Sequence, residues 1–78
     1  MTQLLDRLTP AELKALTLVD AGLSNKAIAE SMSITVGTVK SHLHRAYEKL
    51  EARNRLGAIA KARTRGHLQV SVETLALK

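Results

Sequence analysis

The stretch "ITVGTVKSHLHRAY", from Ile34 to Tyr47, decides the fold of this chain. Its β-branched residues at first suggest a strand. The apolar residues, however, recur at intervals of three and four, which fits an α-helix and argues against the alternation of a half-buried strand. Thr35 suits the N-cap of such a helix. We therefore expect a helix over 36–51 with an apolar inner face made of Val36, Val39, Leu43, Ala46, Tyr47 and Leu50.

The opposite face of this helix is polar. Its members are Gly37, Lys40, Ser41, His44 and Glu48, with Arg45 and Lys49 near the flanks. A glycine inside a helix costs up to about 1 kcal/mol, but Gly37 falls on the polar face, one turn before Lys40 and Ser41. Either the missing side chain allows a close approach to another molecule, or any small residue suits an exposed first turn.

Capping residues bound three further helices. Thr9-Pro10-Ala11-Glu12 has the order of a capping box with its proline, and Gly22 suits the end of a helix over 10–21. Ser24 precedes a helix over 25–32, with Ile28 and Met32 facing the core. Asn54 and Gly66 bound a helix over 55–65, with an apolar stripe made of Leu56, Ile59 and Ala60. We expect an all-α fold, a compact four-helix bundle that contains a helix-turn-helix.

The length of 78 residues suffices for one small domain. We assign 1–7 to an N-terminal extension, 8–66 to the helix-turn-helix domain and 67–78 to a C-terminal tail, in which Leu68, Val70 and Val72 alternate. Cysteine is absent, and neither a secretory signal nor an apolar run of membrane-spanning length is present. These features predict a soluble domain that does not associate with a membrane.

Positive charge is concentrated in one third of the chain. The net charge is +5, and residues 40–65 carry eight basic and two acidic side chains, whereas the remainder carries four basic and five acidic ones. Such a distribution favours a surface that faces phosphate groups over one that merely keeps the protein soluble.

In a helix-turn-helix, the second helix lies in the DNA major groove with its N-terminal half nearest the bases. Lys40 can then donate to guanine O6 and N7, and Ser41 and His44 can reach base edges. Phosphate contacts are expected where helix N-termini or loops present donors. These candidates are Asn25, Lys26, Thr35, Thr38, Arg45, Arg53 and Arg55.

Four segments, "LTPAELKAL", "GLSNKAIAESMSIT", "GTVKSHLHRAYEKL" and "RNRLGAIAKAR", resemble the C-terminal DNA-binding domain of LuxR-type bacterial transcription regulators. The resemblance covers roughly Leu8 to Leu68 without gaps. It implies a four-helix domain in the bacterial cytoplasm, at the nucleoid, that binds double-stranded operator half-sites as the output domain of an activator or repressor. It places base contacts at Lys40, Ser41 and His44. Phosphate contacts fall on Asn25, Lys26, Thr38 and Arg53, with His42 or Arg45 in addition.

The resemblance also implies that the fourth helix can mediate dimerisation. We expect a weak homodimer, strengthened on DNA, through an exposed side of that helix made of Ala58, Lys61, Ala62 and Arg65. Arg63 and Arg65 have an alternative interpretation as helix-end cations favoured by the helix dipole. His42 likewise either packs beside the core or contacts a phosphate.

Two departures from the family pattern concern backbone turns. Ser33 stands where a glycine is common, and Glu51-Ala52 replaces the usual Gly-Val. The third helix is therefore expected to run on by one or two residues. Glu48 replaces a residue that is often basic, and it either repels phosphate or pairs with a nearby Lys or Arg.

Two other function classes are considered. A polymerase-binding module like the last region of a sigma factor shares the Leu-Thr-Pro start and would make RNA polymerase a partner, but it usually lacks the fourth helix. An enzyme is not expected, because the sequence contains no phosphate-binding loop, no metal-ligand cluster and no pairing of nucleophile with base. His42 and His44 point apart on a helix, so we expect neither a metal site nor a cofactor.

Overall fold

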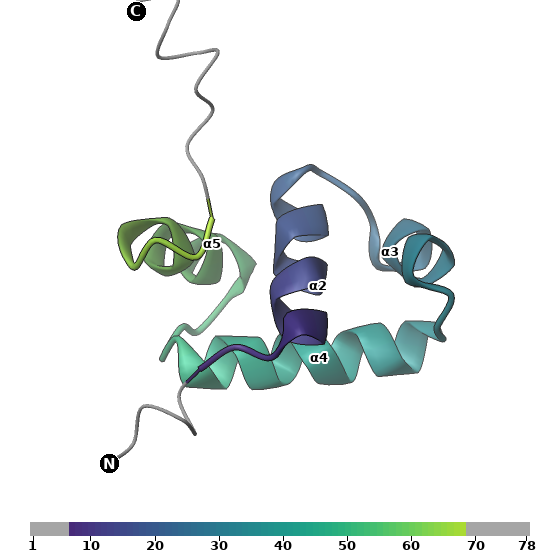
Figure 1. Ribbon diagram of the computed structural model, residues 1–78, viewed down its shortest axis with the longest axis horizontal. Coiled ribbons are helices and arrows are strands. Elements are labelled where there is room, and N and C mark those ends of the chain that lie inside the picture. The colour runs from purple at the N-terminus through teal and green to yellow at the C-terminus, as the bar shows by residue number, and fades with distance from the viewer. Residues whose placement is uncertain (1–6, 69–78) are drawn as a thin grey trace, which may run out of the picture.

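A computed structural model describes residues 7–68. In that part of the chain, four helices and no strand are present: α2 (Pro10–Asp20), α3 (Asn25–Met32), α4 (Val36–Lys49) and α5 (Arg55–Thr64). The expected all-α class is thereby confirmed. The longest helix, α4, contacts each of the other three, with α3 near its N-terminal end and α5 near its C-terminal end (Figure 1). None of the helices in residues 7–68 has the length and apolar character needed to span a membrane.

All four helices begin at the predicted N-caps. The side chains of Thr9, Ser24, Thr35 and Asn54 each accept a hydrogen bond from the backbone N–H three residues later. At Thr9 the capping box is complete, because the Thr9 N–H also donates to Glu12 Oε1 over 2.9 Å. These bonds satisfy donors that a helix N-terminus otherwise leaves unpaired.

All four helices also end in the same backbone motif. Gly22, Ser33, Glu51 and Gly66 adopt positive φ, and paired backbone bonds close each turn in the Schellman pattern. The expectation that the third helix runs on is wrong: α4 ends at Lys49 because Glu51 takes the left-handed conformation that a glycine usually provides. The first and last helices are each one residue shorter than predicted.

The left-handed conformation of Glu51 leads to a stability prediction. Replacing Glu51 by glycine is expected to raise the free energy of unfolding by about 0.5–1 kcal/mol, because a side chain at φ +57° is strained. The ion pair that this change removes, Glu51 to Arg65 at 3.8 Å, is exposed and contributes little. Denaturant unfolding measures the gain. Glu51→Ala is the control, since it removes the ion pair and keeps the strain, and a Glu51→Gly variant less stable than Glu51→Ala would contradict the argument.

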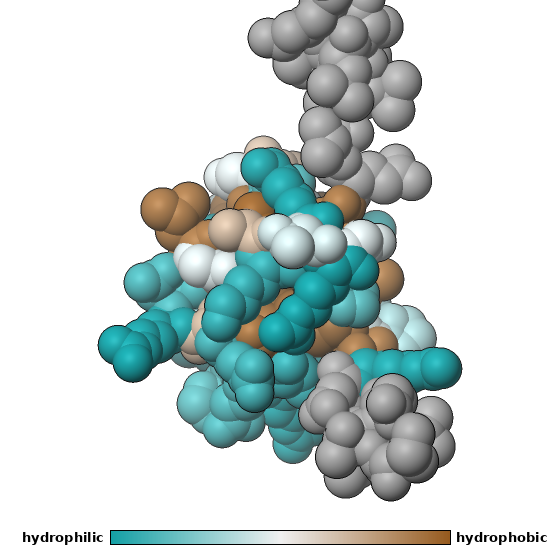
Figure 2. Space-filling model, turned by 90° about the vertical axis from the view of Figure 1, so that its left-hand side faces the viewer, coloured by the Kyte–Doolittle hydropathy of each residue, from teal (hydrophilic) through white to brown (hydrophobic). Residues whose placement is uncertain are grey.

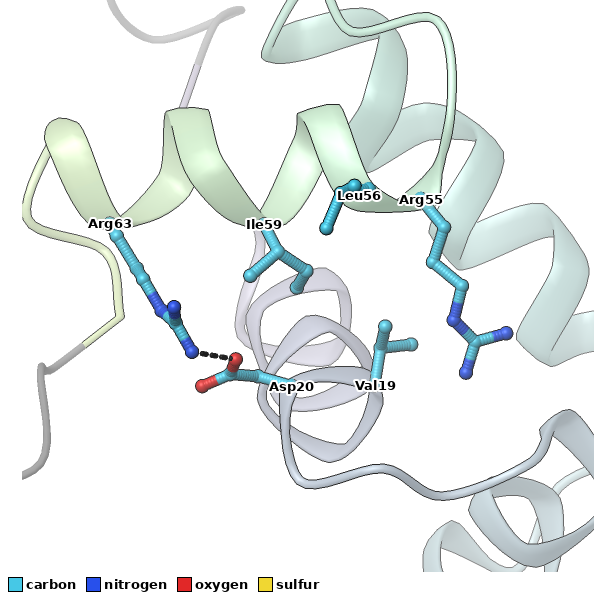
Figure 3. Close-up of a pocket in the computed structure, with 6 residues that line it drawn as sticks. All are labelled: Val19, Asp20, Arg55, Leu56, Ile59 and Arg63. Atoms are coloured by element: carbon cyan, nitrogen blue, oxygen red, sulfur yellow. Dashed lines mark hydrogen bonds and ion pairs between the residues drawn. The ribbon is translucent and has the colours of Figure 1, made fainter.

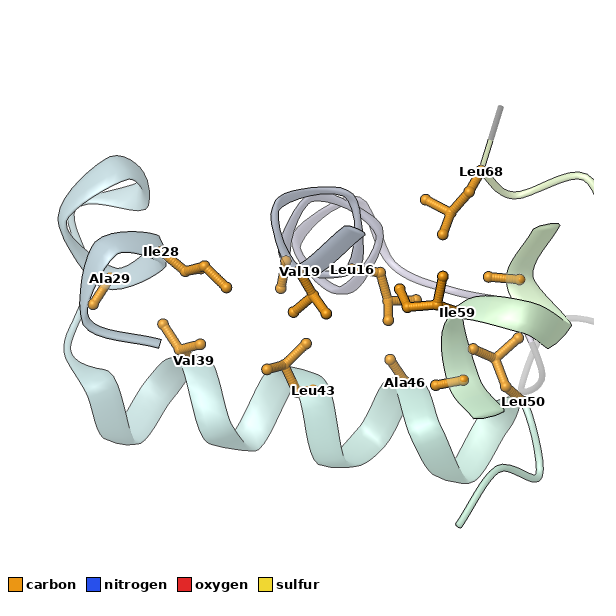
Figure 4. Close-up of a cluster of buried hydrophobic side chains, with 13 residues drawn as sticks. Leu16, Val19, Ile28, Ala29, Val39, Leu43, Ala46, Leu50, Ile59 and Leu68 are labelled. Atoms are coloured by element: carbon orange, nitrogen blue, oxygen red, sulfur yellow. The ribbon is translucent and has the colours of Figure 1, made fainter. Parts of the chain in front are cut away.

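The core lies between α4 and the helices packed on it (Figure 4). Leu16 and Val19 from α2, with Ile28 from α3, meet Val39 and Leu43 of α4. Leu68 is also buried, so the folded body extends two residues beyond the predicted end of the domain at Gly66. Val70 and Val72 of the predicted tail lie outside the described residues. The cluster comprises Ala15, Leu16, Val19, Ile28, Ala29, Val39, Leu43, Ala46, Leu50, Ala58, Ile59, Ala62 and Leu68.

Three predicted core positions are wrong. Val36 is 36% exposed at the start of α4, Leu56 is 80% exposed on α5, and Ala60 on α5 is also exposed. The inner face of α5 is instead made of Ala58, Ile59 and Ala62. Alanine side chains on the inner face let α5 lie close to its neighbours. Small residues are therefore buried on α5, although hydrophobicity alone predicts that the larger Leu56 is buried.

Candidate nucleic-acid interface

The outer face of α4 carries the three residues predicted to contact bases. Lys40, Ser41 and His44 are all exposed, whereas Val39, Leu43 and Ala46 on the other side are buried. The remaining helices pack on the buried side, so the outer face is left open (Figure 1). A helix held from behind in this way presents its front as a rigid surface.

The first turn of α4 is rigid and sterically open. Thr35 Oγ1 accepts from the Thr38 N–H over 3.1 Å, and the two threonine hydroxyls are joined by a 2.9 Å hydrogen bond. Thr35 and Thr38 therefore use most of their hydrogen-bonding capacity on each other, and one hydroxyl proton is left for a phosphate. At Gly37, an added Cβ would meet only Thr35 Oγ1, at an ordinary contact distance of 3.8 Å.

Glu48 pairs with His44 on the outer face. His44 Nε2 lies 3.3 Å from a Glu48 carboxylate oxygen, one turn along the helix, and both side chains are largely exposed. The sequence predicts lysine or arginine as a partner for Glu48, and the partner is instead a histidine. The pair holds the imidazole near the C-terminal half of the face and places one negative charge there.

Four of the basic residues predicted to contact DNA have no hydrogen-bond or ion-pair partner within residues 7–68. Lys40 and Arg45 stand on α4, Lys26 stands in the first turn of α3, and Arg53 stands in the loop before α5. All four are exposed. Their charges are therefore available to an external anion.

The remaining predicted phosphate contact with a positive charge, Arg55, is placed differently. Its guanidinium donates to the Leu23 carbonyl over 2.8 Å, between α2 and α3, and it borders a groove at the C-terminal end of α2. This contact ties α5 to the α2–α3 loop. The geometry does not bring Arg55 together with the outer face of α4.

Asn25, at the start of α3, is partly buried and partly exposed to solvent. The residue is half-buried, and its Oδ1 is buried without a hydrogen-bond partner among the described residues. A carbonyl oxygen repels phosphate oxygens, so only the Nδ2 group can donate to DNA.

Only two of the four predicted dimer residues, Lys61 and Arg65, are exposed. Ala58 and Ala62 are fully buried in the chain's own core. Lys61 donates to the Glu51 carbonyl, and Arg65 lies near Glu51 and the Lys49 carbonyl. The expected exposure of Ala58 and Ala62 is therefore wrong, because this side of α5 packs on the C-terminal end of α4, whereas Lys61 and Arg65 are exposed.

The adjacent side of α5, which faces α2, borders a groove of about 380 Å³. Leu56 and Ile59 point toward Val19 of α2, and Arg63 forms an ion pair with Asp20 across the groove (Figure 3). Figure 2 views this end of the molecule and shows hydrophobic surface framed by hydrophilic side chains. Arg63 thus has an intramolecular partner, which neither of its sequence-based interpretations included.

Comparison with known proteins agrees with the fold described above. The family model described as "Bacterial regulatory proteins, luxR family" matches residues 6–62, which is most of the chain. This chain belongs to the luxR family. Its fold is similar to that in a solved structure of the transcription factor GerE, with a TM-score of 0.77 and 28% identity over 82% of this chain and 96% of that one. This luxR-family chain is therefore a helix-turn-helix DNA-binding domain of the transcription-regulator type.

Two similar full-length regulators are much longer than this luxR-family chain. AlkS of Alcanivorax borkumensis, an HTH-type transcriptional regulator, is 38% identical over 68 residues, which is 87% of this chain and 8% of AlkS. The transcriptional regulatory protein DesR of Bacillus subtilis is 41% identical over 59 residues, 76% of this chain and 30% of DesR.

Proposed function

We propose that this domain binds double-stranded DNA with sequence preference and that α4 enters the major groove. Base edges are contacted by Lys40, Ser41 and His44 from the outer face of α4. Phosphates on either side are contacted by Lys26 and Asn25 from α3 and by Arg45 and Arg53 at the other end of the surface. This arrangement matches the general docking of a helix-turn-helix, in which the second helix reads the groove.

The distribution of paired and unpaired basic residues is the observation that carries this proposal. Lys49, Arg63 and Arg65 pair with carboxylates of the same chain. The four unpaired basic residues that were predicted to contact DNA instead lie on α4 and on the elements at its two ends, whereas Lys14, which also has no partner within residues 7–68, lies on α2. Released counterions would then favour binding, so affinity should fall steeply with salt concentration.

The Lys40→Ala variant tests base reading. It is expected to lose about 1–3 kcal/mol of discrimination at one or two base pairs, because the lysine can donate to guanine O6 and N7. The measurement is a binding titration on a duplex selected from a random library and on a scrambled duplex. Lys14→Ala, which removes an exposed lysine from α2, is the matched control. Equal losses on both duplexes would make Lys40 a phosphate contact and contradict its assignment as a base contact.

We also propose a weak homodimer that forms on DNA through the exposed side of α5, where Leu56 stands. On a duplex with two half-sites, sedimentation is expected to show two copies bound cooperatively, and Leu56→Gln is expected to reduce that cooperativity. The expectation rests on the large exposed apolar side chain, which loses contact with water in a dimer. A single copy on such a duplex, at concentrations that saturate one half-site, would contradict it.

A further inference from the structure

Val36 is an exposed apolar side chain at the start of the helix that faces DNA in the proposed function. It occupies the first position of α4, immediately after the Thr35 cap, and is 36% exposed. Among residues 7–68, only Leu56 is a more exposed large apolar side chain. An isolated exposed valine is ordinary on a protein surface, so its neighbours decide whether it has a role.

Val36 begins the row of side chains that carries two of the predicted base contacts. On a helix, residues four apart form a ridge, and here that ridge runs through Val36, Lys40, His44 and Glu48. The neighbouring ridge begins at Gly37, which has no side chain. The isopropyl group therefore stands beside an open position, one turn before Lys40, in the part of the helix that lies deepest in a major groove.

The side chain is also held in place. Val36 is β-branched and has one strongly preferred rotamer in a helix. The Thr35–Thr38 hydrogen bonds fix the turn that carries it. An apolar group on the floor of the major groove has one apolar counterpart among the four bases, namely the C5 methyl of thymine.

Resting on the proposed function, we infer that Val36 contacts a thymine methyl within two base pairs of the base that Lys40 reads. The side chain thus adds a preference for thymine over cytosine at that position. The contact is apolar and requires no hydrogen bond.

The test removes the two partners of the proposed contact, the thymine methyl and the Val36 side chain, separately and together. The preferred half-site is first selected with the unmodified chain, and each thymine is then replaced by uracil, which lacks only the C5 methyl. One such replacement is expected to weaken binding about fourfold, the effect of one buried methyl group. Val36→Ala should weaken binding to the thymine duplex by about four- to tenfold and should bind the thymine and uracil duplexes equally. If the two groups touch, the combined change weakens binding by less than the product of the two separate fold-changes, and this non-additivity indicates direct contact.

The controls separate this inference from the proposed function. Lys14→Ala, which removes an exposed side chain from α2, should leave the pattern of uracil effects unchanged. Thermal unfolding should show that Val36→Ala remains folded, since the side chain is not in the core. If the uracil effects are the same in Val36→Ala as in the unmodified chain, the inference is wrong and sequence-specific binding stands. If the unmodified chain selects no preferred duplex, the proposed function fails and the inference fails with it.

Discussion

Gly37→Leu is expected to abolish DNA binding while the domain remains folded. Gly37 lies on the outer face of α4, at the start of the ridge that continues through Ser41 and Arg45, and its position is open to the outside. A leucine there would project into the proposed groove contact and hold the helix away from the bases. We expect a loss of at least about 100-fold in affinity, because each lost base contact costs about 1–3 kcal/mol and several would be lost together. Fluorescence anisotropy with the selected duplex measures it.

Gly37→Ala is the matched variant. Its added Cβ lies 3.8 Å from Thr35 Oγ1, an ordinary contact, so the fold should be stabilised by up to about 1 kcal/mol. Denaturant unfolding of both variants shows whether each remains folded. A folded Gly37→Leu variant that binds the selected duplex normally would contradict the placement of this face against DNA.

Glu12→Ala is expected to lower the free energy of unfolding by about 2–3 kcal/mol. Glu12 is 2% exposed, and its carboxylate accepts from Lys49 Nζ over 2.7 Å and from the Thr9 N–H over 2.9 Å. Lys49 also donates to the Arg7 carbonyl. Truncation therefore removes the capping box and leaves a partly buried ammonium group without its counter-charge. Denaturant unfolding measures the loss, and a double-mutant cycle of Glu12→Gln with Lys49→Met separates the ion pair from the cap.

The same carboxylate makes stability depend on pH. Burial by itself would raise the pKa of Glu12, but the hydrogen bonds and charge from Lys49, with the Thr9 backbone bond, outweigh it and lower the pKa below 4.5. A lowered pKa in the folded state contributes stability above the unfolded-state pKa, and that stability is lost as the pH falls through the folded-state pKa. We expect the acid-side loss of stability to be smaller in Glu12→Gln. An unchanged acid-side slope in this variant would contradict the assignment.

The helices could be predicted from the sequence because their signals are local. Capping residues such as Thr9 and Asn54 act within one turn, and the spacing of apolar residues in 36–51 distinguishes a helix from a strand. The end of α3 at Met32 agrees with the prediction, whereas α4 ends at Lys49, before the predicted end at residue 51. There Glu51 takes a left-handed conformation that residues other than glycine rarely adopt, so its side chain gave no signal for the end of the helix.

The candidate site was only partly predictable for a related reason. Periodicity identified the front of α4, but it could not tell that Arg55 and Lys61 bond to carbonyls distant in sequence. Nor could it tell whether leucine or alanine faces inward on α5, since both sets recur at helical spacing. That choice depends on how closely α5 approaches its neighbours, which is a property of the packed domain.

Methylation protection on the selected duplex tests the central claim, that α4 reads the major groove. Dimethyl sulfate modifies guanine N7 in the major groove and adenine N3 in the minor groove. We predict that bound protein protects at least one guanine N7 in each half-site, that adenine N3 in the same half-site remains reactive, and that Lys40→Ala restores the reactivity of that guanine. Unprotected guanines in a fully bound duplex, or protection confined to adenine N3, would contradict the account.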